Sequence, residues 1–214
     1  MTIFAIIGHL AATTGNFNLN DMPGGAGRMD ILCRAVNTSL FLSHDLRREV
    51  TVYLVLLGGT DAPKTIMFSG EKVRSLNPDE RSAGALIKKA LEIPVGEEFR
   101  ESTRGVYVRR GGLSRLLLAH AFAVLDEDGE DIGTATTIPE AFLLSDHLNF
   151  TPEELEMTCS CPKYSVGPKV LHADHTITVL LNVLDRRCGG QYGSGNFLDN
   201  CIPEQSLFLK PPPG

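Results

Sequence analysis

The feature that most constrains the fold is the alternation of short apolar runs with helical patterns along most of the chain. The apolar runs are rich in β-branched and aromatic residues, which is typical of strands buried on both faces of a sheet. The predicted strands cover residues 2–7, 50–57, 65–68, 105–108, 121–125, 141–144 and 164–166. Because strands that alternate with helices build parallel sheets covered on both sides, we predict an α/β fold with a mostly parallel sheet flanked by helices.

Three helices can be placed from local sequence patterns. Asn-Pro-Asp-Glu at residues 77–80 is typical of a helix start in which Asn77 is the N-cap and Pro78 the first helical residue. Thr-Pro-Glu-Glu at residues 151–154 repeats the device, and each such cap stabilises its helix by about 1 kcal/mol. Residues 29–42 carry apolar side chains at helical spacing.

The last predicted helix differs from these, because residues 177–184 leave no polar stripe. Its apolar positions are Ile177, Val179, Leu180, Leu181, Val183 and Leu184. A helix that is apolar all round has to be covered all round. We therefore predict that a second copy of the chain covers this helix in a homodimer, with a core helix inside one subunit as the alternative.

The two ends of the chain differ in character. The first nine residues lack a basic segment and are typical of a first strand rather than a signal peptide, and no apolar run approaches the roughly 20 residues of a membrane span. We therefore expect a cytoplasmic protein with no membrane partner. Nine of the 27 residues from 188 to 214 are Gly or Pro, which predicts a tail without regular structure. The preceding residues, 1–187, are enough for one domain.

The five cysteines form an odd, unevenly spaced set that suits a reduced compartment better than a disulfide framework. Cys159 and Cys161, with His172 and His175 nearby, could hold zinc. Cys-x-Cys is not the usual zinc spacing, however, and no second cysteine pair follows at the expected distance. Plain thiols and helix histidines are the favoured interpretation, so we expect no metal.

The net charge of −6 is unevenly distributed along the chain. Residues 121–156 hold ten Asp or Glu and no Lys or Arg, whereas residues 100–120 hold five Arg and one Glu. This arginine-rich segment, which includes Arg109 and Arg110, is a candidate surface for the phosphates of RNA. A solvated helix face with salt bridges explains the same arginines equally well.

Two glycine-containing segments could serve a ligand. Pro-Gly-Gly-Ala-Gly-Arg at residues 23–28 precedes a predicted helix, where backbone N–H groups can meet an anion. It matches neither a Walker A loop nor G-x-G-x-x-G, so a nicotinamide-dependent oxidoreductase is a poor candidate and a flexible loop is the favoured interpretation. Residues 164–171 pass from a strand through a tight turn into a helix, and ligands of open α/β sheets lie at the carboxyl ends of such strands.

Five motifs in collinear order resemble one known family. They are Asp-Met-Pro-Gly-Gly-Ala-Gly-Arg-Met-Asp at 21–30, Leu-Ser-His-Asp-Leu-Arg at 42–47, Leu-Asn-Pro-Asp-Glu-Arg-Ser at 76–82, Leu-Ser-Asp-His at 144–147 and Val-Gly-Pro-Lys at 166–169. Together they resemble the TrmY family, the tRNA pseudouridine N1-methyltransferases of the SPOUT superfamily. The resemblance runs from residue 1 to about 187 and is far more specific than any single motif.

The resemblance implies a homodimeric SPOUT-type fold with a C-terminal trefoil knot, a rare exception to the rule that chains do not thread through themselves. It also implies that S-adenosylmethionine is the cofactor and is bound by three loops. By position, the cofactor-binding residues are Leu125, Ser145, Val166, Gly167, Pro168, Lys169, Val170, Leu171 and Thr176. Ser145 and Thr176 depart from the family pattern, in which Gly and Cys are common at these places.

The implied reaction transfers a methyl group to N1 of a pseudouridine in tRNA, at position 54 of the T-loop. N1 has to lose a proton, so a nearby carboxylate or cation would help. We expect Asp30 to be the proton acceptor or an orienting group, with Arg28 and Arg34 holding the base or a phosphate. The alternative is that Asp30, in the first turn of a helix, only stabilises the helix dipole.

Two other functions compete with this one. A related SPOUT enzyme could act on another RNA, such as a pseudouridine in rRNA. A non-catalytic homologue could bind RNA and have lost the cofactor, although the intact segment 166–171 argues against that.

Overall fold

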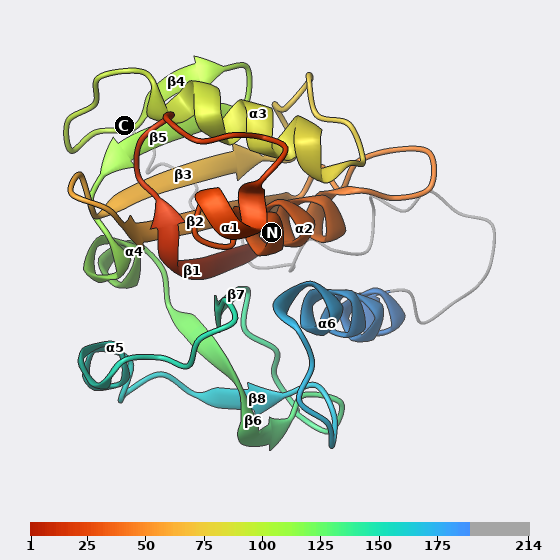
Figure 1. Ribbon diagram of the computed structural model, residues 1–214. Helices are drawn as coiled ribbons and strands as arrows, with labels where there is room; N and C mark the ends of the chain where they lie inside the picture. The colour runs from red at the N-terminus through yellow and green to blue at the C-terminus, as the bar shows by residue number, and fades with distance from the viewer. Residues whose placement is uncertain (189–214) are drawn as a thin grey trace, which may run out of the picture.

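The computed structural model describes residues 1–188, and in that part of the chain eight strands form one sheet (Figure 1). The strands are β1 (Thr2–Ala12), β2 (Val50–Gly58), β3 (Lys64–Ser69), β4 (Arg100–Thr103), β5 (Val106–Arg110), β6 (Phe122–Asp131), β7 (Ala141–Ser145) and β8 (Lys163–Ser165). The helices are α1 (Met22–Gly25), α2 (Met29–Leu40), α3 (Glu80–Leu91), α4 (Leu113–Ala119), α5 (Pro152–Met157) and α6 (Ala173–Cys188). The tail predicted at 188–214 lies, from residue 189 on, outside the described residues.

The sheet has a parallel half and an antiparallel half. Its strand order is β4-β5-β3-β2-β1-β7-β6-β8. The five strands from β2 to β8 in that order pair in parallel, whereas β3, β5 and β4 add antiparallel strands at one edge. The predicted α/β fold with a sheet flanked by helices is therefore confirmed, but the sheet is mixed rather than mostly parallel, with four parallel and three antiparallel pairings. The predicted strands missed β4 and ended β6 at residue 125, although β6 continues to Asp131.

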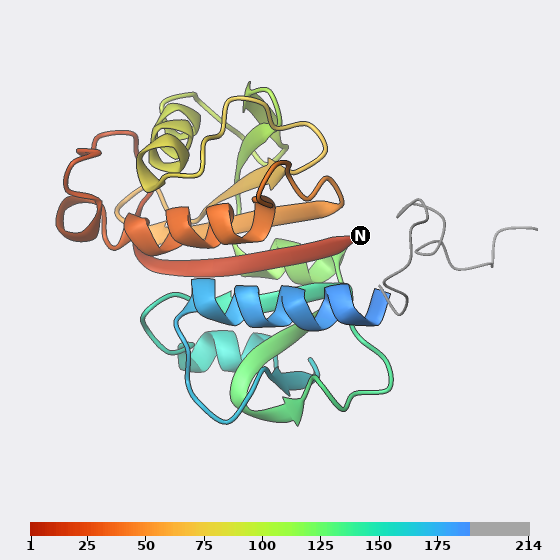
Figure 2. The ribbon, with the colours of Figure 1, turned by 90° about the vertical axis from the view of Figure 1, so that its right-hand side faces the viewer.

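Both faces of the sheet are covered, and side chains along β1 alternate between them. Phe4 and Ile6 belong to the core shared with α2, α3 and α6, whereas Ile3, Ala5 and Ile7 belong to a smaller core shared with α4. Figures 1 and 2 show α2 and α6 on one side of β1, with α4 and α5 on the other. Burial on both faces explains why the parallel strands are continuous apolar runs.

Two of the predicted helix starts can be compared directly with the structure. Thr151 caps α5 in a complete capping box, since its side chain accepts from the Glu154 N–H while the Glu154 carboxylate accepts from the Thr151 N–H. The prediction that Asn77 caps the helix now identified as α3 is wrong. Asp79 is the N-cap of α3, because its carboxylate accepts a 2.7 Å hydrogen bond from the backbone N–H of Ser82.

The last helix, α6, lies beside α2 (Figure 2). Ile177, Leu180 and Leu181 are buried in the core of the single chain. The expectation that no polar stripe remains is wrong, because Thr178 and Asn182 stand one turn apart and are exposed.

No helix within residues 1–188 is long and apolar enough to cross a membrane.

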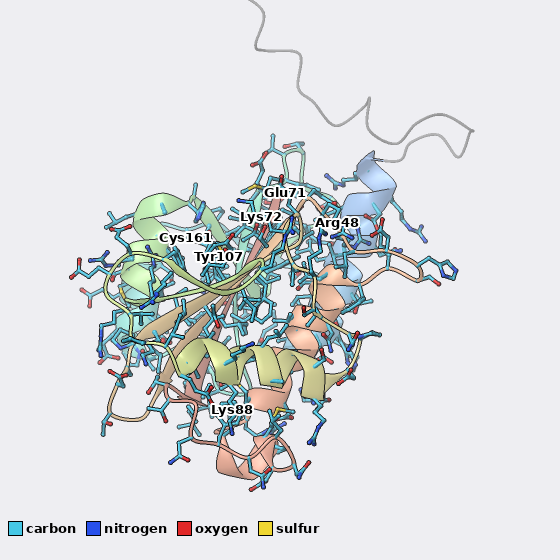
Figure 3. All side chains as sticks on the ribbon, turned by 90° about the horizontal axis from the view of Figure 1, so that it is seen from above. Arg48, Glu71, Lys72, Lys88, Tyr107 and Cys161 are labelled. Atoms are coloured by element: carbon cyan, nitrogen blue, oxygen red, sulfur yellow. The ribbon has the colours of Figure 1, made fainter. Side chains whose placement is uncertain are left out.

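The glycine-rich segment 23–28, predicted as a flexible loop, consists of the end of a short helix, α1, and a turn at residues 26–28. Asp21 caps α1, its carboxylate accepting a 3.1 Å hydrogen bond from the Gly24 N–H. A Cβ atom at Gly27 would overlap the backbone carbonyl of Leu10, and Gly27 has a φ of 63°, so glycine is required for the close approach to β1. Lys88 of α3, labelled in Figure 3, fixes the preceding loop by donating to the Phe17 carbonyl at 2.7 Å.

Candidate functional site

A cavity of about 570 Å³ lies where β7 ends, beside the middle of β6 and the segment before α6. A volume of this size is typical of small-molecule sites, and ligands of α/β sheets bind at the carboxyl ends of parallel strands. Three loops and the first turn of α6 form the walls. The lining residues are Leu125, Asp126, Glu127, Leu144, Ser145, Asp146, His147, Leu148, Asn149, Phe150, Leu155, Lys163, Val170, Leu171, His172, Ala173 and Thr176.

The cavity brings together residues from all three loops that the sequence singled out. Five of the predicted cofactor residues line it, namely Leu125, Ser145, Val170, Leu171 and Thr176. Val166, Gly167, Pro168 and Lys169 come directly before Val170 in the same loop but are not among the lining residues. Gly167 has a φ of 151° and no neighbour where a Cβ atom would stand, so its backbone conformation is what requires glycine there.

The two positions that depart from the family pattern make local contacts on the cavity wall. The Ser145 hydroxyl donates to the Leu148 carbonyl, and the Thr176 hydroxyl donates to the Leu171 carbonyl at 3.5 Å. Serine and threonine therefore bond to the main chain of the loops that form the cavity.

A buried histidine anchors one wall of the cavity. The backbone N–H of His9 donates to Asp146 Oδ2 at 3.0 Å, and the ring nitrogen Nδ1 of His9 donates to Asp146 Oδ1 at 2.9 Å. The other ring nitrogen, Nε2, donates to Glu154 Oε2 at 2.9 Å. The hydrogen bond to Asp146, reinforced by Glu154, outweighs burial and raises the pKa of His9 to about 9. Sequence reasoning missed His9, because its partners are 137 and 145 residues away.

A second charged cluster surrounds Asp30 at the start of α2. Arg28 donates to the two Asp30 oxygens through Nε and Nη2, each at 3.1 Å, and Arg34 adds a bond at 3.0 Å. Arg34 also contacts Glu80 at 3.3 Å and Asp174 at 3.4 Å. Arg28, Asp30 and Arg34 therefore lie together, and Arg34 stands among three carboxylates.

These ion pairs define the chemistry of Asp30. Burial alone would raise the pKa of Asp30, but the bonds from Arg28 and Arg34 outweigh it and hold the pKa below the ordinary value. A carboxylate in that state is ionised at neutral pH and is a weak proton acceptor, which favours an orienting role over that of a general base. Asp174 joins this cluster to the cavity, because it shares the first turn of α6 with Ala173 and Thr176.

The arginine-rich segment lies in the antiparallel half of the sheet, away from the cavity. The Arg109 guanidinium stacks 4.3 Å from the ring centroid of Phe99, and Arg110 forms an ion pair with Asp61 at 2.5 Å. Strands β3, β2 and β1 separate β5 from β7. Arg109 and Arg110 therefore belong to a surface that is distinct from the cavity.

Within residues 1–188, no group of three or more His, Cys, Asp or Glu side chains is arranged so that it could hold a metal ion. Of the proposed zinc ligands, Cys159 is exposed and Cys161 is partly buried. The rings of His172 and His175 lie edge to face, 6.1 Å apart between centroids.

A family model described as "Putative SAM-dependent RNA methyltransferase" matches residues 1–188. The chain belongs to this family. The match spans every strand and helix of the structure, including the three loops at the cavity, and it confirms the resemblance to the TrmY family.

Several curated relatives are similar over nearly their whole length. A protein of Methanocorpusculum labreanum is 61% identical over 191 residues, which is 87% of this chain and 98% of the relative. A protein of Methanospirillum hungatei is 50% identical, covering 89% of this chain and 99% of the relative. Both are named tRNA (pseudouridine(54)-N(1))-methyltransferase.

One solved structure shows the same fold at low sequence identity. It is the crystal structure of Archaeoglobus fulgidus Nep1 bound to S-adenosylhomocysteine, with a TM-score of 0.60 and 15% identity. The match covers 86% of this chain and 97% of the other. This likeness supports the α/β fold of residues 1–188.

Proposed function

We propose that this protein transfers the methyl group of S-adenosylmethionine to N1 of a pseudouridine in tRNA, at position 54. The observation that carries the proposal is the 61% identity to a relative of that name, over 98% of the relative's length. The cavity beside β6 and the end of β7 supports it, because it combines predicted residues from three separate segments of the chain in one hollow.

The residues around the cavity fit the cofactor. Apolar side chains such as Leu125, Leu144 and Leu171 suit an adenine ring, and Asp126 and Glu127 suit a cationic ligand. Leu125, Ser145, Val170, Leu171 and Thr176 would hold it, and the loop from Val166 to Lys169 would contribute backbone groups. S-adenosylmethionine supplies, when bound, a sulfonium methyl group whose transfer needs no acid.

The cluster at Asp30 is the proposed site for the target base. Arg28 leaves 38% of its side chain exposed while it holds Asp30, so it can present a guanidinium to the base or a phosphate. Asp30 stays ionised and orients Arg28 and the base, and Arg34 locks Asp30 in place. Positioning of this kind can lower a barrier by up to ~7–11 kcal/mol.

The remaining features of the proposal concern assembly and location. We propose a single methyltransferase domain at residues 1–187, a trefoil knot in its C-terminal part and a homodimer formed through α6. The half-buried side chains of Val179 and Val183 support an additional cover on that helix. The proposed setting is the cytoplasm, and Arg109 and Arg110 are the proposed contacts with RNA outside the cavity.

One experiment tests substrate and reaction together. The full chain is incubated with radiolabelled S-adenosylmethionine and, in separate reactions, with rRNA and with tRNA transcripts with and without prior conversion of uridine 54 to pseudouridine. Binding of tRNA and of the cofactor is measured alongside. We expect label only in the pseudouridylated tRNA, at N1 of residue 54. Label in rRNA alone would establish the competing substrate. Binding of tRNA without binding of the cofactor would establish the non-catalytic alternative.

A further inference from the structure

His9 joins three segments that are far apart in the sequence. It stands near the carboxyl end of β1, while Asp146 follows β7 and Glu154 lies in the first turn of α5. The side chains of His9, Asp146 and Glu154 are 8%, 1% and 6% exposed, so solvent takes little part in their contacts. His9 therefore links β1 to the loop after β7, through Asp146, and to α5, through Glu154; we call this contact the His9 bridge.

The geometry defines the charge of the bridge. Both ring nitrogens of His9 lie 2.9 Å from carboxylate oxygens. An ionised carboxylate only accepts hydrogen bonds, so both nitrogens have to donate, and only the imidazolium carries two N–H groups. The pKa of about 9 agrees with this assignment, which rests on the contacts.

The bridge reaches the cavity wall through Asp146. Besides both His9 bonds, the Asp146 carboxylate accepts a 3.0 Å bond from the backbone N–H of Leu148. Asp146 and Leu148 both line the cavity, in the loop that runs from Ser145 to Phe150. On the other side, Glu154 uses the oxygen that binds His9 to accept from the Thr151 N–H at 2.8 Å as well. Both ends of this loop are therefore tied to the same imidazolium.

We propose that His9 is a positioning residue that holds the loop from Ser145 to Phe150 in its cofactor-binding shape by bridging Asp146 and Glu154. This inference rests on the proposed function, since it assigns the cavity to S-adenosylmethionine. His9 does not line the cavity and acts through Asp146. Loss of its charge leaves two buried carboxylates facing a neutral group, which frees the loop.

The charged groups around the bridge come from four segments. Asp146 and Glu154 bond directly to the ring, and His147 lies 3.4 Å from Asp146. Arg28, in the segment before α2, interacts with Asp146 through its charge. These neighbours can also respond to pH. The effect of His9 is therefore measured as the difference in cofactor affinity between wild type and a variant that lacks only this imidazole.

The test compares His9→Gln with wild type and with His44→Gln, a matched control in the exposed turn between α2 and β2. Affinity for S-adenosylhomocysteine is measured by calorimetry at about pH 7 and about pH 9.5. At the lower pH we expect His9→Gln to bind on the order of tenfold more weakly or worse, because a displacement of about 1 Å at a supporting group has effects of this size. The difference from wild type should shrink at the higher pH, where wild type loses the same charge. The His44 variant should match wild type throughout.

A second measurement does not depend on the cofactor. Hydrogen exchange of the Leu148 amide reports directly on its bond to Asp146, and it should speed up in His9→Gln but not in His44→Gln. Glu154→Gln keeps an acceptor for His9 and removes one charge, so it should weaken affinity less than His9→Gln does. Unchanged affinity and unchanged Leu148 exchange in His9→Gln would overturn the inference while leaving the proposed function intact. Failure of wild type to bind S-adenosylhomocysteine would instead refute the proposed function.

Discussion

Replacement of His9 by glutamine should change how the stability of the protein depends on pH. The pKa of His9 rises from 6.5 to about 9 in the folded chain, because Asp146 and Glu154 favour the charged ring. The folded state therefore binds the proton more tightly than the unfolded state does. The resulting stabilisation is fully present below pH 6.5 and is lost as the pH rises through about 9.

The size of the effect follows from the shift. Each pKa unit corresponds to 1.36 kcal/mol, so the shift from 6.5 to about 9 is worth about 3 kcal/mol at low pH. About 2 kcal/mol of this should disappear between pH 7 and pH 9.5, where the ring loses its proton. Glutamine does not titrate, so His9→Gln should lack this part of the pH dependence.

The assay is chemical denaturation of wild type and His9→Gln at a series of pH values, with the difference in unfolding free energy plotted against pH. Taking the difference cancels the other titrating groups that the two proteins share. We expect a difference that falls by about 2 kcal/mol from pH 7 to pH 9.5. A difference that stays constant across this range would show that His9 is not an imidazolium between two carboxylates, and the reasoning would fail.

Three further predictions concern other parts of the site and core. Gly167→Ala should weaken binding of S-adenosylmethionine in calorimetry, because alanine disfavours a φ of 151°, whereas Gly96→Ala, also in open space, should not. Asp30→Asn should cost about 2 kcal/mol in denaturation at pH 7, since it leaves Arg28 without its carboxylate and removes one of the three around Arg34. That cost should shrink as the pH falls below 3.8, the ordinary pKa of an aspartate carboxyl. The pKa of Asp30 is lowered in the folded chain, so the Asp30 carboxylate adds stability only while it is ionised. Phe142→Ala should cost about 3–5 kcal/mol by thermal unfolding, because Phe142 is fully buried and stacks on Phe4; a cost below about 1 kcal/mol would contradict this packing.

Local patterns were enough to predict much of the fold. The apolar runs located seven of the eight strands within residues 1–188, because the central strands β1, β2 and β7 are buried on both faces and each carries its own apolar signal. Strand β4 was missed because Arg-Glu-Ser-Thr at 100–103 is polar and lies at the edge of the sheet. Asn77 was predicted as the cap because Pro78 follows it, as at many helix starts, whereas the bond from the Ser82 N–H to the Asp79 carboxylate places the cap two residues later.

Part of the candidate site could likewise be predicted from local motifs, and part depends on contacts between distant segments. The segments that line the cavity could be named from motifs, since Ser145 and Val170 stand in short conspicuous runs. The bridge made by His9 could not be predicted, because no local pattern joins a residue of the first strand to partners more than 130 residues away. The ion pairs of Arg34 with Glu80 and Asp174 depend likewise on how α2, α3 and α6 pack.

Because β1 lies between β2 and β7, the sheet can be completed only late in synthesis of the chain. β2 pairs with β1 after a crossover that contains α1 and α2 and then forms a local unit with β3, but the other edge of β1 waits for β7 at residues 141–145. Until those residues leave the ribosome, an apolar strand presents unpaired backbone groups, which is the surface that drives association between nascent chains. Chains truncated before residue 141 should therefore aggregate, whereas chains extending through α6 should not.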